Sequence, residues 1–83
     1  METRDLAVPE QIEVCTRYLN ELWEKTPRKR VSSYLIKHEV ERLYASYIDA
    51  DSLVTAAKAL GFETKPVENK VFIYMVKTKK MGF

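Results

Sequence analysis

The sequence predicts an α+β fold in which three helices are followed by a C-terminal β-hairpin. Apolar residues recur at helical spacing as far as Leu60, and Gly61 then supplies a helix stop. The remaining residues contain two short runs rich in β-branched and aromatic side chains, which are typical of strands. Because 83 residues can enclose only one modest core, we expect a single domain over residues 1–83, ordered at about 9–77 with a flexible tail at 78–83.

The first predicted helix spans residues 9–25. Pro9 suits its first turn, where the missing N–H would have no helical partner. Pro27 ends the helix, because the residue before a proline is pushed out of helical geometry. The apolar stripe of this helix consists of Ile12, Cys15, Leu19 and Leu22. Tyr18 and Trp23 lie beside the stripe, and we expect both to close the core rather than to form a dimer contact.

Two more helices follow, joined by a turn of only a few residues. Ser32 or Ser33 is the expected N-cap of the second, and Asp49 is the expected N-cap of the third, with its side chain accepting a backbone N–H. Gly61 is expected to end the third helix in a left-handed conformation, with Phe62 packing on the last turn. The residues predicted to face the core are Ile36, Val40, Leu43 and Tyr47 in the second helix, and Leu53, Ala56, Ala57 and Leu60 in the third.

The predicted hairpin pairs residues 62–67 with residues 71–77 across a turn-like Glu-Asn-Lys sequence. Pro66 must then lie on a sheet edge or at a bulge, since it cannot donate a hydrogen bond to a neighbouring strand. Three helices and a hairpin, with a short connection between the second and third helices, is the order of a helix-turn-helix domain with a wing. We therefore predict a winged-helix-like helix-turn-helix architecture.

The composition argues against a membrane-spanning or secreted protein. No apolar run approaches the ~18 residues that a membrane-spanning helix needs. The first residues lack the basic-then-apolar pattern of a secretory signal, and a single cysteine cannot form an internal disulfide. We expect a cytoplasmic protein with no membrane partner.

Residues with catalytic or metal-binding chemistry are few and scattered. Cys15 lies on the apolar stripe of the first helix, so we expect it to be an inert core residue. One histidine and one cysteine cannot supply the ligands of a structural zinc site. His38 shares a helix face with Tyr34 and Glu41, but no nucleophile accompanies them, and we interpret this histidine as structural. We expect no enzymatic activity, no metal and no cofactor.

Charge is distributed unevenly along the chain. Residues 1–24 hold six acids and two bases, a balance of −4, whereas residues 25–83 hold twelve bases and six acids, a balance of +6. A basic region of this kind favours a polyanionic partner, and we predict weak binding to duplex DNA by a regulatory or accessory factor. Asp49 and Asp51, at the start of the third helix, oppose this prediction because carboxylates repel phosphate.

The predicted DNA-contacting residues lie in the loop after the first helix, on the second and third helices, and on the hairpin. They are Arg28, Lys29, Arg30, Lys37, Thr55, Lys58, Lys65 and Lys70. Thr55 and Lys58 are the candidates for contacts with base edges, and the other bases are candidates for contacts with phosphates.

The competing prediction is a protein-interaction module that acts as an adaptor or inhibitor. It would use the Tyr34/His38 face of the second helix, or the aromatic residues of the hairpin, because tyrosine and methionine are enriched in such surfaces. Its partner-binding residues on the second helix would be Tyr34, His38, Glu41 and Arg42. A monomer is expected, with a dimer as the alternative.

Residues 32–62 resemble a pattern found in small proteins of phages and integrative conjugative elements. In that pattern a Ser-Tyr-Gly-Leu-Lys-His-like helix precedes a Tyr-Val-Ser-Asn-Gly turn and an alanine-rich helix that ends in Gly-Phe or Gly-Tyr. The residues that match in kind are Ser33, Tyr34, Ile36, Lys37, His38, Glu41, Tyr47, Ile48, Ala56, Ala57, Gly61 and Phe62. Leu35 stands in place of the glycine of the pattern, and residues 49–51 replace its Ser-Asn-Gly. The resemblance implies an origin in a mobile element and implies no particular activity.

Overall fold

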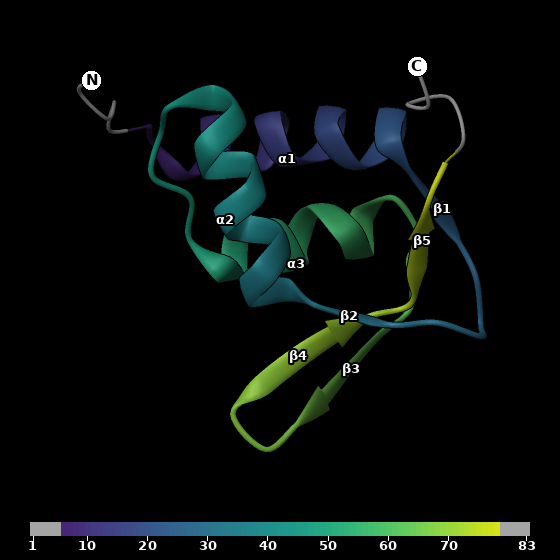
Figure 1. The fold of residues 1–83 in the computed structure, drawn as a ribbon. Coiled ribbons are helices and arrows are strands. Elements are labelled where there is room, and N and C mark those ends of the chain that lie inside the picture. Colours follow the sequence, from purple (N-terminus) through teal and green to yellow (C-terminus); the bar gives the residue numbers. More distant parts are fainter. Residues whose placement is uncertain (1–5, 79–83) are drawn as a thin grey trace.

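The computed structural model describes residues 6–78, and Figure 1 shows the order of its helices and strands. Within these residues three helices are combined with short antiparallel strands, which confirms the α+β class. The helices are α1 (Val8–Leu22), α2 (Ser33–Tyr44) and α3 (Ala50–Ala59). The strands are β1 (Trp23–Lys25), β2 (Val31–Ser32), β3 (Thr64–Val67), β4 (Lys70–Ile73) and β5 (Met75–Lys77). None of the helices in this part of the chain has the length and apolarity that crossing a membrane requires.

The strands bring distant parts of the chain together. β3 and β4 form the core of the predicted hairpin and pair along their full length. β4 also pairs with β2, and β5 pairs with β1. Residues 23–32 therefore run antiparallel to residues 72–77, apart from a loop at residues 26–30 that leaves the line of the strands. β3 is the outer strand of its sheet, which agrees with the edge position predicted from Pro66.

The strands differ from the prediction at two places. The first predicted helix ends at Leu22 rather than at Lys25, because Trp23–Lys25 pair with β5 near the other end of the chain. The second strand of the predicted hairpin is divided at Tyr74, because β4 pairs with β2 and β3 whereas β5 pairs with β1. Thr78, predicted to begin a flexible tail, donates its N–H to the carbonyl oxygen of Leu22 at 2.9 Å. The rest of that predicted tail, residues 79–83, lies outside the described residues.

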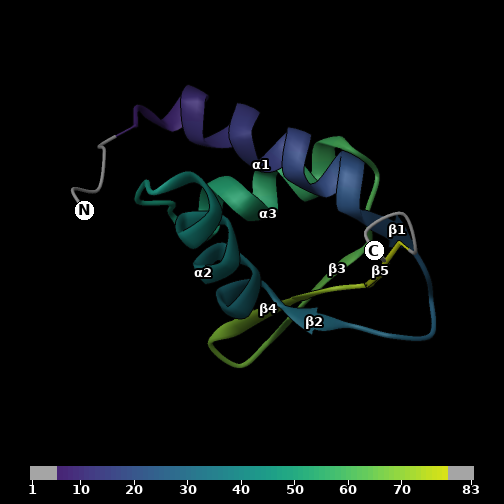
Figure 2. The same ribbon diagram turned by 45° about the horizontal axis from the view of Figure 1, so that its top comes forward.

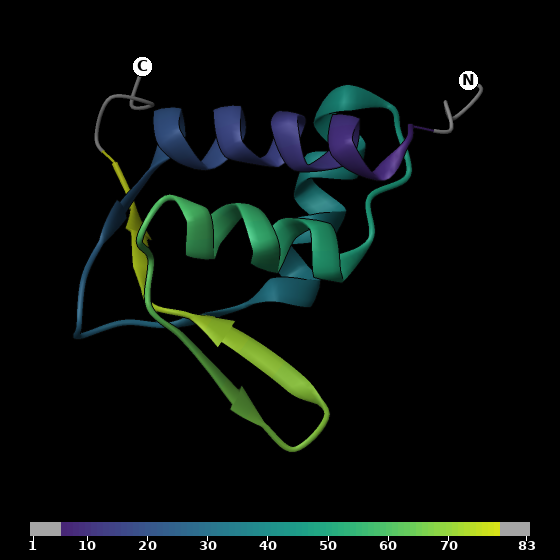
Figure 3. The ribbon, with the colours of Figure 1, turned by 180° about the vertical axis from the view of Figure 1, so that it is seen from behind.

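The third helix packs on both other helices, above the hairpin. Figures 1 and 2 show α1 and α3 side by side, with α2 crossing them and the β3–β4 hairpin projecting from the other side of the molecule. Seen from behind, α3 lies uncovered between α1 and the hairpin (Figure 3). The core between these elements consists of Cys15, Tyr18, Leu19, Trp23, Ile36, Val40, Ile48, Leu53, Ala56, Ala57, Phe62, Ile73 and Met75. Tyr18 and Trp23 are thus buried as predicted, while Leu22 and Leu60 are half-buried at the edge of the core.

The second helix ends earlier than its apolar pattern indicates. Leu43 and Tyr47, which the periodicity places on the core face, are 59% and 48% exposed. The prediction is wrong for both residues. Tyr47 lies beyond the helix, because α2 ends at Tyr44 and Ala45 turns the chain with a left-handed φ of 50°. Leu43 lies within α2, but the buried residues of the helix are Ser33, Ile36, Lys37 and Val40, and Leu43 falls outside the face that they form. Ile48 occupies the core position instead and is 0% exposed.

The start of α2 and the end of α3 follow from local signals. Ser32 is the N-cap of α2, where its Oγ accepts the N–H of Tyr34 at 3.2 Å. After α3 the chain turns at Gly61, which has a φ of 89°. The N–H of Phe62 then donates to the carbonyl oxygen of Ala57 at 2.9 Å, which closes the helix end. Both predictions are confirmed.

The start of α3 is held by another helix. Asp49 occupies the N-cap position, but its side chain makes no capping hydrogen bond to α3, so this part of the prediction is wrong. Instead the N–H of Asp49 donates to Oε1 of Gln11 at 2.8 Å, and the same oxygen accepts the hydroxyl of Ser52 at 3.0 Å. Gln11 is 4% exposed, so a buried amide of α1 fixes where α3 begins. This contact joins distant residues, and no local pattern could predict it.

Replacing Gly61 with alanine is expected to lower the free energy of unfolding by about 1–2 kcal/mol. The φ of 89° disfavours a side chain, and an added Cβ would lie 2.9 Å from Nζ of Lys25. Urea unfolding followed by the fluorescence of Trp23 measures the loss. Gly61→Asn is the matched variant and should lose less stability, because asparagine tolerates the left-handed region better. Wild-type stability in Gly61→Ala would contradict this account of the helix stop.

Candidate nucleic-acid interface

Three consecutive bases occupy the loop at residues 26–30. Arg28, Lys29 and Arg30 are all exposed. Oγ1 of Thr26 accepts the N–H of Arg28 at 3.2 Å, which orders the start of the loop. Because β1 and β2 pair with β5 and β4 on either side of it, the loop is held at one edge of the molecule and presents its bases to solvent (Figure 1).

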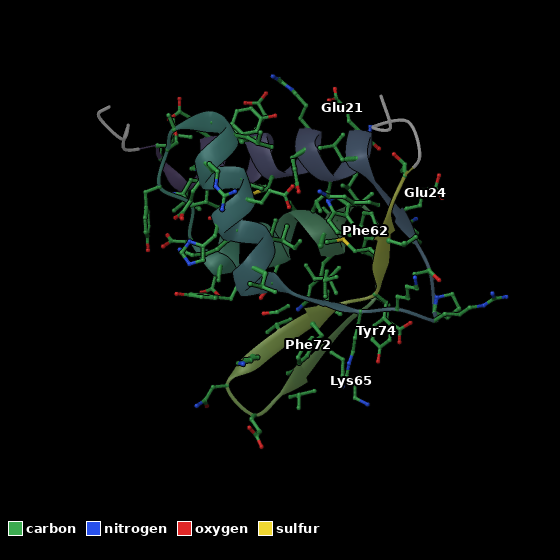
Figure 4. All side chains as sticks on the ribbon, viewed as in Figure 1. Glu21, Glu24, Phe62, Lys65, Phe72 and Tyr74 are labelled. Carbon is green, nitrogen blue, oxygen red and sulfur yellow. The ribbon has the colours of Figure 1, made fainter. Side chains whose placement is uncertain are left out.

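The guanidinium of Arg30 connects this loop to the hairpin. It lies 4.6 Å from the centre of the Phe72 ring, which is a cation–π distance. Phe72 is paired with Lys65 across β3 and β4, so the two side chains lie on the same face of the sheet. Lys70 is two residues from Phe72 along β4 and belongs to the same face. Figure 4 shows Lys65 and Phe72 on the projecting hairpin. We call Arg30, Lys65, Lys70 and Phe72 the basic sheet face.

The outer side of α3 carries the two residues predicted to meet base edges. Thr55 and Lys58 are exposed, whereas Ala56 and Ala57 on the inner side are 0% exposed. Figure 3 shows that no other helix covers this side of α3. Both predicted side chains are therefore accessible, beside the hairpin that carries the basic sheet face.

Two aspartates stand at the start of α3. Asp51 is exposed and lines a cleft of about 390 Å³ between the N-terminal ends of α2 and α3 and the turn of the hairpin. Lys70 lines the same cleft, so its charge offsets part of the repulsion that Asp51 exerts on a phosphate. Asp49 is half-buried, and its carboxylate raises the pKa of the Tyr47 phenol. The negative charge that opposes DNA therefore lies chiefly at Asp51.

Lys37 does not contribute to this surface, and its predicted role as a phosphate contact is corrected. Its side chain is 10% exposed, and its Nζ donates to the carbonyl oxygen of Ile48 at 2.9 Å and to Oε2 of Glu41 at 3.1 Å. The N–H of Ile48 donates to the same Oε2 at 3.0 Å. The ammonium also lies 4.7 Å from the centre of the Tyr47 ring. Lys37 and Glu41 thus close the turn between α2 and α3, and their four-residue spacing is the signal in the sequence for this role.

The pKa of Glu41 reflects that turn. Burial acts to raise the pKa of this carboxyl group, but hydrogen bonds from the Ile48 N–H, the Lys37 ammonium and the His38 ring outweigh burial. The net effect is a pKa below the ordinary value of 4.5. Glu41 is therefore a charged structural residue.

The alternative protein-binding residues of α2 are accessible except for Glu41. Tyr34, His38 and Arg42 are exposed. The rings of Tyr34 and His38 meet edge to face, with their centroids 4.4 Å apart. Nδ1 of His38 lies 3.0 Å from Oε1 of Glu41, whose side chain is only 19% exposed. This face therefore presents aromatic and basic groups, while its carboxylate is already engaged.

The hairpin offers less apolar surface to a partner than its sequence indicates. Ile73 and Met75 are 0% exposed, because they point into the core. Phe72 and Tyr74 are half-buried, and Phe72 is partly covered by Arg30. The hairpin is thus better suited to present charge than to present aromatic side chains.

Cys15 is a core residue, as predicted. It is 0% exposed, and burial raises the pKa of its thiol to about 12, so the reactive thiolate is disfavoured. Among residues 6–78, no three histidine, cysteine, aspartate or glutamate side chains are placed so that they could hold a metal ion.

Comparison with known proteins adds no family to this description. No family model, no curated protein and no solved structure matches the chain. The surface formed by the loop at residues 26–30, the β3–β4 hairpin and α3 is therefore the basis for inferring the function.

Proposed function

We propose that this protein is a small, non-enzymatic, winged-helix-like domain that binds duplex DNA weakly, as a regulatory or accessory factor of a mobile element. The order of elements supports this proposal, since α2 and α3 are joined by residues 45–49 and the β3–β4 hairpin follows α3. In helix-turn-helix proteins the second helix of the motif approaches the bases. By this analogy α3 would approach the DNA and the hairpin would lie along the backbone beside it.

The observation that carries the proposal is the basic sheet face beside α3. Arg30 is held over Phe72 next to Lys65 and Lys70, and the two bases before Arg30 extend the positive surface along the loop. Bases arranged in this way can neutralise successive phosphates and release their counterions. Such contacts position a protein on DNA without reading its sequence.

Thr55 and Lys58 are the side chains through which α3 would meet the base edges. A hydroxyl and an ammonium can donate to the acceptors exposed in the major groove. Asp51, at the N-terminal end of α3, would repel the backbone, so we propose that the helix approaches DNA with its C-terminal half. This repulsion is also the reason why we expect weak binding.

An NMR titration with a duplex of mixed sequence at low salt tests the proposal. We expect amide shifts at residues 28–30, at Thr55 and Lys58, and along β3 and β4. The shifts should fade as salt is raised, because counterion release makes phosphate contacts salt-dependent. Absence of shifts, or shifts confined to Tyr34 and His38, would contradict DNA binding through this surface.

The second candidate, a protein-interaction module acting as an adaptor or inhibitor, is favoured by the apolar side chains that α2 exposes. Tyr34, Leu35 and Leu43 are 58%, 66% and 59% exposed. Exposed apolar groups that gather on one element often mark a contact surface. If a cell extract yields one co-purifying protein, if Leu35→Glu abolishes its capture, and if DNA causes no shifts, the function belongs to this second candidate.

A further inference from the structure

A cleft opens where the N-terminal ends of α2 and α3 meet the turn of the hairpin. In Figures 1 and 3 both helix starts lie towards the end of the hairpin that carries this turn. The cleft has a volume of about 390 Å³, which falls within the roughly 300–1,000 Å³ of small-molecule sites. Its apolar lining comes from Tyr34 of α2, Ala50 and Val54 of α3, and Val71 of β4. Such a lining suits a small ligand with an apolar group.

A hydroxyl group without a partner opens into this cleft. Ser33 lines the cleft and is only 4% exposed. Its Oγ makes no hydrogen bond within residues 6–78. In the same range the polar side-chain atoms that are sealed from solvent without a partner belong to Tyr18, Trp23 and Thr78. The Ser33 hydroxyl is not one of them, so solvent reaches it, and the cleft is the opening that Ser33 lines. A buried hydroxyl in this position favours a ligand that supplies its partner.

The N-terminal end of α3 adds hydrogen-bond donors to the same cleft. The first N–H groups of a helix have no partner within the helix, and the side chain of Asp49 does not cap α3. Ala50 and Asp51, the first two residues of α3, both line the cleft. The positive end of the helix dipole strengthens the attraction of these N–H groups for an anion. Together with the Ser33 hydroxyl they form an end of the cleft that suits a carboxylate.

Two side chains of opposite charge also line the cleft, Asp51 from α3 and Lys70 from the hairpin. Both are exposed, and neither forms an ion pair with another residue in the described part of the chain. The free carboxylate of Asp51 repels a multiply charged anion such as phosphate, but it attracts an ammonium group. A lining with one free charge of each sign favours a ligand that carries both charges.

We propose that this cleft binds a free α-amino acid with an apolar side chain. The carboxylate of the ligand accepts hydrogen bonds from the Ser33 hydroxyl and from the first N–H groups of α3. Its ammonium group donates to the carboxylate of Asp51, and its side chain lies against Val54 and Val71. The C-terminus of a peptide lacks the ammonium group, and phosphate lacks both the ammonium and the apolar group. The inference does not rest on the proposed binding of DNA.

An NMR titration of the full chain with phenylalanine, without DNA, tests this site. We expect saturable amide shifts at Ser33, Ala50, Asp51, Val54 and Val71. The dissociation constant should be on the order of 1 mM, because the ligand is small and the cleft is open to solvent on one side. Two analogues of similar shape separate the contributions of the charges. 3-Phenylpropanoate lacks the ammonium group and phenethylamine lacks the carboxylate, so each should bind about 10-fold more weakly than phenylalanine.

Three variants connect the affinities to the residues of the cleft. Asp51→Asn should weaken phenylalanine by about 10-fold and strengthen 3-phenylpropanoate, because it removes both the attraction for the ammonium group and the repulsion of the carboxylate. Ser33→Ala should weaken both ligands that carry a carboxylate and leave phenethylamine unchanged. Glu13→Gln is the matched control, since it makes the same kind of change as Asp51→Asn at an exposed carboxylate of α1 outside the cleft. It should leave all three affinities unchanged, and circular dichroism should show that every variant is folded.

Three results would overturn the proposal. The first is the absence of saturable shifts with phenylalanine up to about 20 mM, which is well above the expected dissociation constant. The second is binding of 3-phenylpropanoate or inorganic phosphate as tightly as phenylalanine, which would make the cleft a simple anion site. The third is an equal loss of affinity in Asp51→Asn and Glu13→Gln, which would show that net charge rather than the cleft governs binding.

Discussion

Replacing Arg28, Lys29 and Arg30 together with alanine is expected to lower the affinity for duplex DNA at about 50 mM salt by about 100- to 1,000-fold. Each base that neutralises a phosphate contributes about 0.9 to the slope of log affinity against log salt, so the slope should fall by about 2.7. The loss should be similar for all sequences, because phosphate contacts carry no sequence information. Fluorescence anisotropy at several salt concentrations measures both quantities.

The matched control removes three bases from other faces of the protein. Arg17→Ala, Arg42→Ala and Lys77→Ala together change the net charge by the same amount, and all three side chains are exposed and lie outside the loop at residues 26–30. The control should keep nearly the wild-type salt slope, since its bases would not approach a phosphate. An equal loss in the two triple variants would show that net charge alone governs binding, and it would remove the loop from the interface.

The positions of these bases could be predicted from the sequence, but their arrangement could not. Consecutive bases beside Pro27 indicate an exposed loop, and the structure confirms that they are exposed. Their connection to the hairpin depends on the contact of Arg30 with Phe72. That contact exists because β2 pairs with β4, which joins segments about forty positions apart in the chain. A pattern read along the chain carries no information about such pairings.

The ends of the helices show the same difference between features set by nearby residues, which the sequence predicts, and features set by contacts between distant segments, which it does not. The Ser32 cap and the Gly61 stop act on residues within a few positions of them, and both could be predicted. The end of α2 could not, because Tyr47 continues the apolar period of the helix beyond Tyr44, where α2 ends. The turn that follows the helix is held by a set of hydrogen bonds around Lys37 and Glu41 that reaches across to the segment before α3.

That set of hydrogen bonds leads to the largest stability effect that we expect. Replacing Glu41 with alanine should lower the free energy of unfolding by about 3 kcal/mol, because it leaves the Lys37 ammonium buried without its counter-charge. It also removes the acceptor of the Ile48 N–H, which lies 3.0 Å from the carboxylate. Urea unfolding followed by Trp23 fluorescence measures the loss. Lys37→Met in the Glu41→Ala background should recover part of it, since the uncompensated charge is then absent.

The contribution of Glu41 should also make the free energy of unfolding depend on pH in the acidic range. Its pKa in the folded protein lies below the ordinary value of 4.5, so the folded state keeps the carboxylate charged where the unfolded state takes up a proton. The stabilisation is therefore fully present above about pH 4.5 and is lost as the pH falls through the folded pKa. Glu41→Ala should lose less stability between pH 5 and pH 3 than the wild type loses.

The control for this prediction is an exposed pair with the same spacing. Glu13 and Arg17 lie 4.0 Å apart on α1, with side chains 72% and 61% exposed. Glu13→Ala should cost at most about 0.5 kcal/mol, because water already screens that pair. Both glutamates pair with a base four residues away, but the order of acid and base is reversed. Pairs of either order contribute only about 0.2–0.5 kcal/mol on an exposed helix, so a much larger difference between the variants must come from burial and from the Ile48 hydrogen bond. A loss in Glu41→Ala no greater than in Glu13→Ala would show that other contacts hold the turn between α2 and α3.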